Sequence, residues 1–129
     1  MLRDLAVRGW GIFRYYLRRI KVKLFGENSA IQVEDLPSGR MRDVEISGVT
    51  VLLANVGGKF YAVNNVCTHR QCPLSAGDLS GTTITCACHG SQFDVTTGKV
   101  LRGPAITDVA AYRVGIANGS VIIDAGSSA

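Results

Sequence analysis

Residues 67–74 read CTHRQCPL, and residues 86–94 read CACHGSQFD. These two short segments contain all four cysteines and both histidines of the 129-residue chain. Cysteines and histidines scattered along a sequence suit ordinary core and surface positions, whereas their concentration in two turn-like segments is typical of metal binding. The sequence therefore predicts a metal centre held between two loops.

The spacing of four candidate ligands bears on the choice of metal. Zinc sites usually separate paired ligands by two to four residues. Cys67 and His69 are closer together than that, while Cys86 and His89 suit a single metal ion. One thiolate and one imidazole from each loop also fit a two-iron cluster, with the thiolates on one iron and the imidazoles on the other. Spacing alone leaves zinc and a two-iron cluster open.

Both segments, together with the later Gly103-Pro104-Ala105, resemble the Rieske iron–sulfur signature, and the resemblance covers about residues 31–124. It implies an all-β fold: a Rieske-type antiparallel β-sandwich or barrel with two cluster-binding loops at one tip. It also implies one [2Fe–2S] cluster per chain, with these ligands: Cys67, His69, Cys86 and His89.

This ligand set makes the implied cluster easy to reduce. Four thiolates give an oxidised [2Fe–2S] core a net charge of about −2, which opposes an incoming electron, whereas two thiolates and two neutral imidazoles bring it to about zero. The reduction potential is therefore expected well above that of all-cysteine ferredoxins, in the range of roughly −150 to +300 mV. Exposed His69 and His89 would also couple electron transfer to pH.

The resemblance assigns roles to five further residues. It implies a disulfide between Cys72 and Cys88 that pins the two loops together, with a pair of free thiols as the alternative. It implies that the Ser91 hydroxyl donates to a bridging sulfide and that Pro104 lies in a loop covering the cluster, with an ordinary turn as the alternative. Phe93 stands where quinol-oxidising members have Tyr, so one hydroxyl donor is missing and a lower potential is expected.

The chain beyond residue 30 shows the two-residue periodicity of β-strands. Gly57-Gly58 and Asn118-Gly119 are turn signals and predict hairpins. We expect the Rieske domain at residues 31–125 and a flexible tail at residues 126–129. The expected strands are residues 31–36, 49–56, 59–63, 82–85, 111–116 and 120–124.

The N-terminal region has a different character. Residues 2–25 have the three- and four-residue periodicity of an amphipathic helix. Residues 1–26 hold seven basic side chains and one acidic side chain, so their formal charge is +6. Because the formal net charge of the whole chain is +4, the remaining residues carry −2. We expect a basic arm at residues 1–26 and a linker at residues 27–30. Docking to a redox complex, contact with an anionic membrane surface, and packing on the domain's own sheet remain open as its role.

The predicted function is one-electron transfer, as a ferredoxin-like carrier or an electron-transfer subunit of a membrane-associated oxidoreductase. The partners are redox proteins, with no small-molecule substrate and no nucleic acid, because no recognised nucleic-acid module accompanies the basic charge. No catalytic residues are expected, since the chain has no Ser-His-Asp set and no spare acid–base pair.

Alternatives from other classes also have to be weighed. One is the catalytic iron–sulfur subunit of a quinol-oxidising complex, against which Phe93 and the cation Arg70 count. Another is the ferredoxin component of a ring-hydroxylating oxygenase, against which the extra cysteine pair and the basic arm count. A redox-sensing module is a third. No long apolar run or export signal stands out, so we expect a cytoplasmic protein, with the arm able to meet the cytoplasmic face of the membrane.

Overall fold

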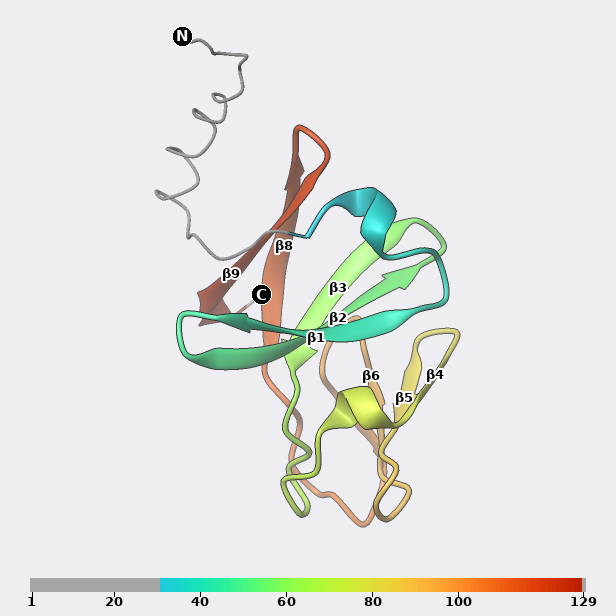
Figure 1. The fold of residues 1–129 in the computed structure, drawn as a ribbon. Coiled ribbons are helices and arrows are strands. Elements are labelled where there is room, and N and C mark those ends of the chain that lie inside the picture. Colours follow the sequence, from blue (N-terminus) through green and yellow to red (C-terminus); the bar gives the residue numbers. More distant parts are fainter. Residues whose placement is uncertain (1–30, 129) are drawn as a thin grey trace, which may run out of the picture. The chain divides into compact units, whose positions relative to one another are not determined.

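The computed structural model describes residues 31–128, and these residues form two antiparallel β-sheets (Figure 1). The predicted all-β class is confirmed. The helix and linker predicted at residues 1–26 and 27–30 lie outside the described residues. Within residues 31–128, no helix has the length and apolar character needed to cross a membrane.

The larger sheet has five strands in the order β1-β2-β3-β8-β9. Three of its junctions are two-residue hairpin turns: Ser47-Gly48, Gly57-Gly58 and Asn118-Gly119. All six turn residues have positive φ, the geometry of turns that match the twist of the flanking strands. Both predicted hairpins are therefore confirmed. The strands are β1 (Met41–Ile46), β2 (Val49–Val56), β3 (Lys59–Asn64), β8 (Ala111–Ala117) and β9 (Ser120–Ser128).

The smaller sheet has four short strands in the order β4-β5-β6-β7. Only residues 83–85 of these strands fall within a predicted strand. Three-residue strands show too little alternation to be recognised in a sequence. The strands are β4 (Asp78–Ser80), β5 (Thr83–Thr85), β6 (Gln92–Asp94) and β7 (Val100–Arg102).

The sequence prediction was wrong at residues 31–36. This segment forms a single bridge between Gln32 and Ser120 and then the short 3-10 helix η1 (Val33–Asp35). The Asp35 carboxylate accepts a hydrogen bond from the Gln32 backbone N–H at 3.2 Å, which caps the turn and favours it over a strand. Strand β1 was missed because its charged side chains, such as Asp43 and Glu45, point to solvent and hide the alternation, as is common on edge strands.

Strand β2 is buried on both faces. Because side chains alternate across a strand, Leu52 and Ala54 pack in one cluster while Val51 and Leu53 pack in another. The cluster of Leu52 also contains residues of β3, of the smaller sheet, of the cysteine segments and of the segments that follow β6 and β7: Val63, Cys67, Leu74, Ile84, Cys86, Phe93, Val95, Ala105 and Val109. The cysteine segments are thus anchored in the main core of the domain.

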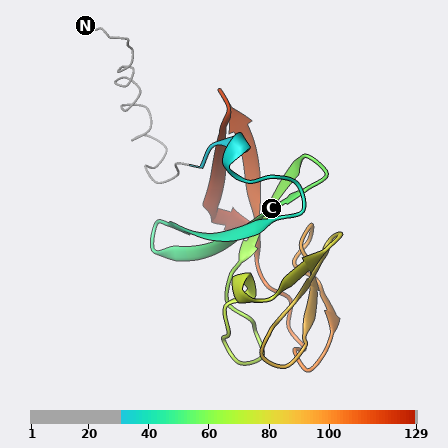
Figure 2. The ribbon, with the colours of Figure 1, turned by 45° about the vertical axis from the view of Figure 1, so that its right-hand side comes forward.

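Three loops lie at the same end of the described domain in both views (Figures 1 and 2). The first loop, residues 65–73, runs from β3 to the short helix η2 (Leu74–Ala76). The second loop, residues 86–91, joins β5 to β6, and the third loop, residues 103–110, joins β7 to β8. The predicted placement of both cysteine segments at one tip is confirmed.

The base of the third loop is held by a close backbone approach. Gly98 has φ of +82°, and a Cβ at this position would collide with the carbonyl of Val109. The Val109 N–H in turn donates to the Gly98 carbonyl at 2.9 Å. Only glycine satisfies both the backbone angle and the available space.

We predict that Gly98→Ala lowers the free energy of unfolding by more than about 2 kcal/mol, because it adds a backbone collision to an unfavourable φ. Gly39→Ala is the matched control, since Gly39 has a similar φ of +87° and open space around it, and it should lose about 1 kcal/mol. Chemical denaturation followed by circular dichroism measures both. Equal losses in the two variants would show that the close approach to Val109 contributes nothing.

Candidate metal centre

The first loop closes on itself through two backbone hydrogen bonds. The Cys67 N–H donates to the Cys72 carbonyl at 2.9 Å, and the Gln71 N–H donates to the Cys67 carbonyl at 2.8 Å. Gln71 adopts φ of 62°, in the left-handed region that non-glycine residues rarely occupy. The turn places Cys67 at its start and leaves His69 at its apex.

The second loop repeats this backbone pattern. The Cys86 N–H donates to the Ser91 carbonyl at 2.8 Å, and the Gly90 N–H donates to the Cys86 carbonyl at 3.1 Å. Gly90, four residues after Cys86 as Gln71 is after Cys67, also has positive φ. The two loops are therefore equivalent in backbone geometry, with Cys67 and Cys86 at matching positions.

The two thiols and the two imidazoles lie in different environments. Cys67 and Cys86 are free thiols and are only 1% and 3% exposed. His69 is half-buried and His89 is exposed. The two imidazole rings meet edge to face, with ring centroids 5.1 Å apart. Sulfur donors thus come from the interior and nitrogen donors from the surface of the same tip.

The environment of His69 favours the neutral form of its imidazole by lowering its pKa. Desolvation is the largest cause that lowers the pKa of His69, followed by the positive charge of Arg70 and by His89. A neutral imidazole has a free lone pair, which is the form that binds a metal ion. The local electrostatics therefore suit a nitrogen ligand.

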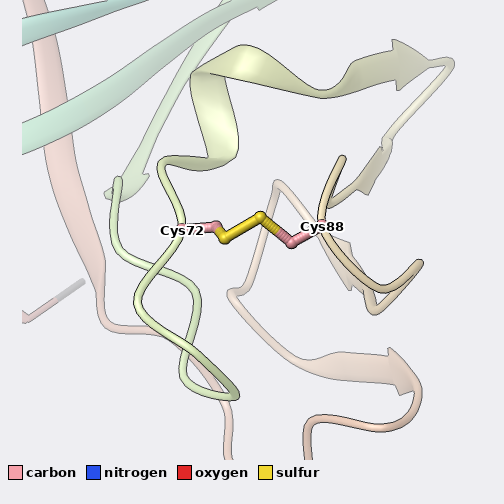
Figure 3. Close-up of a disulfide and its surroundings, with 2 residues drawn as sticks. All are labelled: Cys72 and Cys88. Carbon is pink, nitrogen blue, oxygen red and sulfur yellow. A yellow bond between two sulfur atoms is a disulfide. The ribbon is translucent and has the colours of Figure 1, made fainter.

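A disulfide joins the first loop to the second (Figure 3). It links Cys72 to Cys88, the pairing implied by the resemblance, with their Cα atoms 6.5 Å apart. The sulfur of Cys86 also lies within 4.8 Å of both disulfide sulfurs. Because a disulfide sulfur carries no thiolate, this group of three cysteines offers one ligand, Cys86, and not three.

The third loop is tied to both cysteine loops. The Ala105 N–H donates to the Ser91 hydroxyl oxygen at 3.0 Å, and the Thr68 hydroxyl donates to the Thr107 carbonyl at 2.6 Å. Pro104, which follows a cis peptide bond, is exposed. Ser91 is 1% exposed, and its oxygen accepts here, so its own hydroxyl hydrogen stays available for another acceptor. The three loops therefore form one connected unit.

Phe93 does not reach the surface of the site. It is fully buried on β6, in the cluster that also contains Cys67 and Cys86. Its ring supports the second loop from below by packing.

The sequence analysis missed Asn65 and Thr68. Asn65 is 3% exposed, and its side-chain oxygen accepts a hydrogen bond from the Ser75 N–H at 2.8 Å. Its backbone carbonyl accepts from the Leu74 N–H at 2.7 Å, and its own N–H donates to the Thr50 carbonyl. These bonds clamp the base of the first loop. A polar Asn at the end of a strand pattern, two residues before a cysteine, is the sequence signal that could have identified Asn65. Nothing in the sequence pointed to the contact made by Thr68.

The donor set fits a mixed-ligand iron–sulfur cluster. The chain has four cysteines and two histidines in all, and the disulfide uses two of the cysteines. Two thiols and two imidazoles remain, and the structure brings them to one tip. An all-thiolate cluster does not fit, because it needs four free cysteines.

Comparison with known proteins agrees with this geometry. The sequence model of the Rieske [2Fe-2S] domain family matches residues 27–113. The ferredoxin component of the naphthalene 1,2-dioxygenase system of Pseudomonas putida is 38% identical over 95 residues, which cover 74% of this chain and 91% of that protein.

Solved structures show the same likeness. The ferredoxin of carbazole 1,9a-dioxygenase from Nocardioides aromaticivorans IC177 superposes with a TM-score of 0.72 and 26% identity, over 76% of this chain and 95% of the other. A chain from a complex of reduced oxygenase and oxidized ferredoxin in carbazole 1,9a-dioxygenase gives a TM-score of 0.71 and 30% identity, over 74% and 99%.

The fold and the two-loop tip define a small iron–sulfur electron carrier. The chain belongs to the Rieske [2Fe-2S] family. Its cofactor is a [2Fe–2S] cluster and its function is electron transfer with redox proteins. The predicted cofactor, function and kind of partner are therefore confirmed.

We predict that Gln71→Gly raises the free energy of unfolding by about 0.5–1 kcal/mol, because glycine adopts the left-handed conformation without the steric cost that glutamine bears. Gly90→Ala, at the matching position of the second loop, should lower it by about 1 kcal/mol, since open space surrounds Gly90 and only the φ penalty applies. Chemical denaturation of both variants checks this. Stabilisation by Gly90→Ala or destabilisation by Gln71→Gly would contradict the steric cost that we assign to a non-glycine residue at these two matching positions.

Proposed function

We propose that Cys67, His69, Cys86 and His89 would bind the [2Fe–2S] cluster, with the thiolates as ligands of one iron and the imidazoles as ligands of the other. The observation that carries this assignment is the ligand inventory: the disulfide leaves two thiols, and the chain holds two histidines. Zinc in the same four positions is the competing assignment, and family membership argues against it.

The chain's residues supply the environment of the cofactor. When bound, the cluster provides a one-electron couple. Buried Cys67 and Cys86 would hold it on the core side, where packed apolar side chains exclude water. Half-buried His69 and exposed His89 would hold it on the surface side, where a docked partner could exchange an electron through their rings.

Three neighbouring residues tune and cover the cluster. We assign the Ser91 hydroxyl as a hydrogen-bond donor to a bridging sulfide, because its hydrogen is not needed for the contact with Ala105. Phe93 supplies packing without the hydroxyl that a tyrosine would add, which lowers the potential. Pro104 covers the cluster from the third loop, whose two ties to the cysteine loops hold it there.

We propose that the protein carries electrons from a reductase to a ring-hydroxylating oxygenase. Relatives that are components of such systems, matching about three quarters of this chain, support this choice over the membrane-associated oxidoreductase placed first in the sequence analysis. The cation Arg70 beside His69 and the missing hydroxyl at Phe93 speak against a quinol site. The disulfide is a departure from this class, because the ferredoxins of ring-hydroxylating oxygenases generally lack the extra cysteine pair.

We further propose that the domain begins at residue 31, after an added arm at residues 1–26 and a linker at residues 27–30. Its last strand, β9, runs to Ser128 and so passes the boundary predicted at residue 125. The family match begins at residue 27, so the arm lies outside it. Its charge of +6 suits an acidic partner or an anionic membrane surface. The carrier is then cytoplasmic, with the arm holding it near the membrane or near its redox complex.

The ligand assignment predicts a clear division among the four cysteines. Cys67→Ser and Cys86→Ser should abolish the reducible cluster, because each removes one of two thiolate ligands, and His69→Cys should retain iron but lose the mixed-ligand electron paramagnetic resonance spectrum.

The double variant Cys72→Ser with Cys88→Ser is the matched control. It removes two sulfurs from the same loops and should keep the spectrum, with faster loss of iron because the loops are no longer linked. Iron analysis and the reduced-state spectrum decide the matter. Complete loss of the cluster in this control, or an unchanged spectrum in His69→Cys, would exclude the proposed ligand set.

The arm proposal predicts that deletion of residues 1–26 leaves the cluster spectrum intact and abolishes association with membranes or with the redox complex. Co-sedimentation with vesicles containing anionic lipid tests the first, and co-purification with the reductase and oxygenase tests the second. Neutral vesicles are the control, since attraction of about 1 kcal/mol per basic residue depends on anionic lipid. Unchanged association after deletion, in both assays, would remove this role.

A further inference from the structure

The third loop presents one apolar side chain almost fully to solvent. Ile106 is 90% exposed, whereas the other exposed large hydrophobic residues of the described chain lie between 41% and 52%. A partly exposed aliphatic residue is ordinary on protein surfaces. An isoleucine with nine tenths of its surface in water, at the tip that holds the histidines, calls for a specific explanation.

The two neighbours of Ile106 are fixed to different cluster loops. Ala105 is 4% exposed, and its N–H is bonded to Ser91 in the second loop. Thr107 accepts a hydrogen bond from Thr68, the residue before His69 in the first loop. The backbone on both sides of Ile106 is therefore held, and its side chain is presented outward in a defined position. Such preorganisation lowers the entropy lost when a side chain enters a partner.

Two exposed basic side chains belong to the elements of this tip. Arg70 lies next to His69 in the first loop, and Arg102 ends β7 just before the third loop; both are exposed. The nearest carboxylate in sequence, Asp108, accepts a hydrogen bond from the Val100 N–H at 2.8 Å and is engaged in holding the loop. Besides the apolar projection, the three loops and the end of β7 therefore carry two cations and one carboxylate, a small positive excess, although the chain beyond residue 26 is slightly acidic.

We propose that Ile106 is the apolar anchor of the docking surface for the oxygenase, inserting into an apolar pocket that carboxylates border. The inference rests on the proposed function and adds to it the residue that determines affinity. A few side chains buried in pockets at the centre of an interface carry most of its binding energy, while charged residues at the rim mainly set the association rate. Ile106 and Arg70 therefore have separable roles.

The test uses the full-length, cluster-loaded protein with the reductase and oxygenase components of the naphthalene 1,2-dioxygenase system of Pseudomonas putida. The variants are Ile106→Ala, Ile116→Ala and Arg70→Gln. Ile116 is the matched control: it is 52% exposed and lies by the β8–β9 turn, which sits at the other end of the domain from the three loops (Figure 1). Steady-state reduction of the oxygenase is followed as a function of carrier concentration, at low and high salt.

We expect Ile106→Ala to raise the KM for the carrier by at least about tenfold at both salt concentrations, with kcat and midpoint potential unchanged. Ile116→Ala should change KM by less than about twofold. Arg70→Gln should raise KM at low salt only, because salt screens exposed charges.

Each contrary result has a distinct meaning. If Ile106→Ala behaves like Ile116→Ala, the anchor is overturned while the proposed function stands. If Ile106→Ala impairs reduction by the reductase but not transfer to the oxygenase, the assigned partner is wrong. A shifted midpoint potential would mean that Ile106 acts on the cluster and not on docking. If the wild-type protein exchanges electrons with neither component, the proposed function fails and the anchor with it.

Discussion

The covalent link between Cys72 and Cys88 governs the chemistry of this protein, because it decides what each sulfur can do. It ties the first loop to the second, and it removes two of four sulfurs from the pool of possible ligands. The remaining thiols, Cys67 and Cys86, are buried at matching positions of two loops with the same backbone hydrogen bonds. With the two histidines of the chain, these thiols make up the even set of two sulfur and two nitrogen donors that we propose as ligands.

The rest of the domain serves to hold these loops still. Strand β2 is buried on both faces, so one strand connects the core beneath the site to the second cluster of the larger sheet. Both free thiols belong to the first of these clusters. A site built into the core in this way resists the small displacements that loosen a metal centre. The third loop completes the tip by bonding to each cysteine loop once.

This arrangement separates two tasks that an electron carrier must combine. In the proposed arrangement, the interior side would keep the cofactor dry and fixed, while the histidine side and the third loop would face the partner. Three proposals depend on this division between an inner and an outer side: the ligand set, the oxygenase partner and the anchor Ile106. Surface charge contributes in the same direction. After desolvation, Arg70 is the next cause that lowers the pKa of His69, and Arg70 would also lie at the proposed docking surface.

The sequence by itself determined the strands with clear alternation, two of the hairpins and the two cysteine–histidine segments that the structure brings to one tip, because each depends on local spacing or on residue chemistry. It failed at residues 31–36, where a capped turn replaced a strand, and at β1, where exposed charges hid the pattern. Only the tertiary structure decided that Asn65 clamps the first loop, that Thr68 reaches Thr107, and that Ile106 projects into solvent. Thr68 and Thr107 are 39 positions apart, and such contacts depend on how the loops meet in space, which no local pattern encodes.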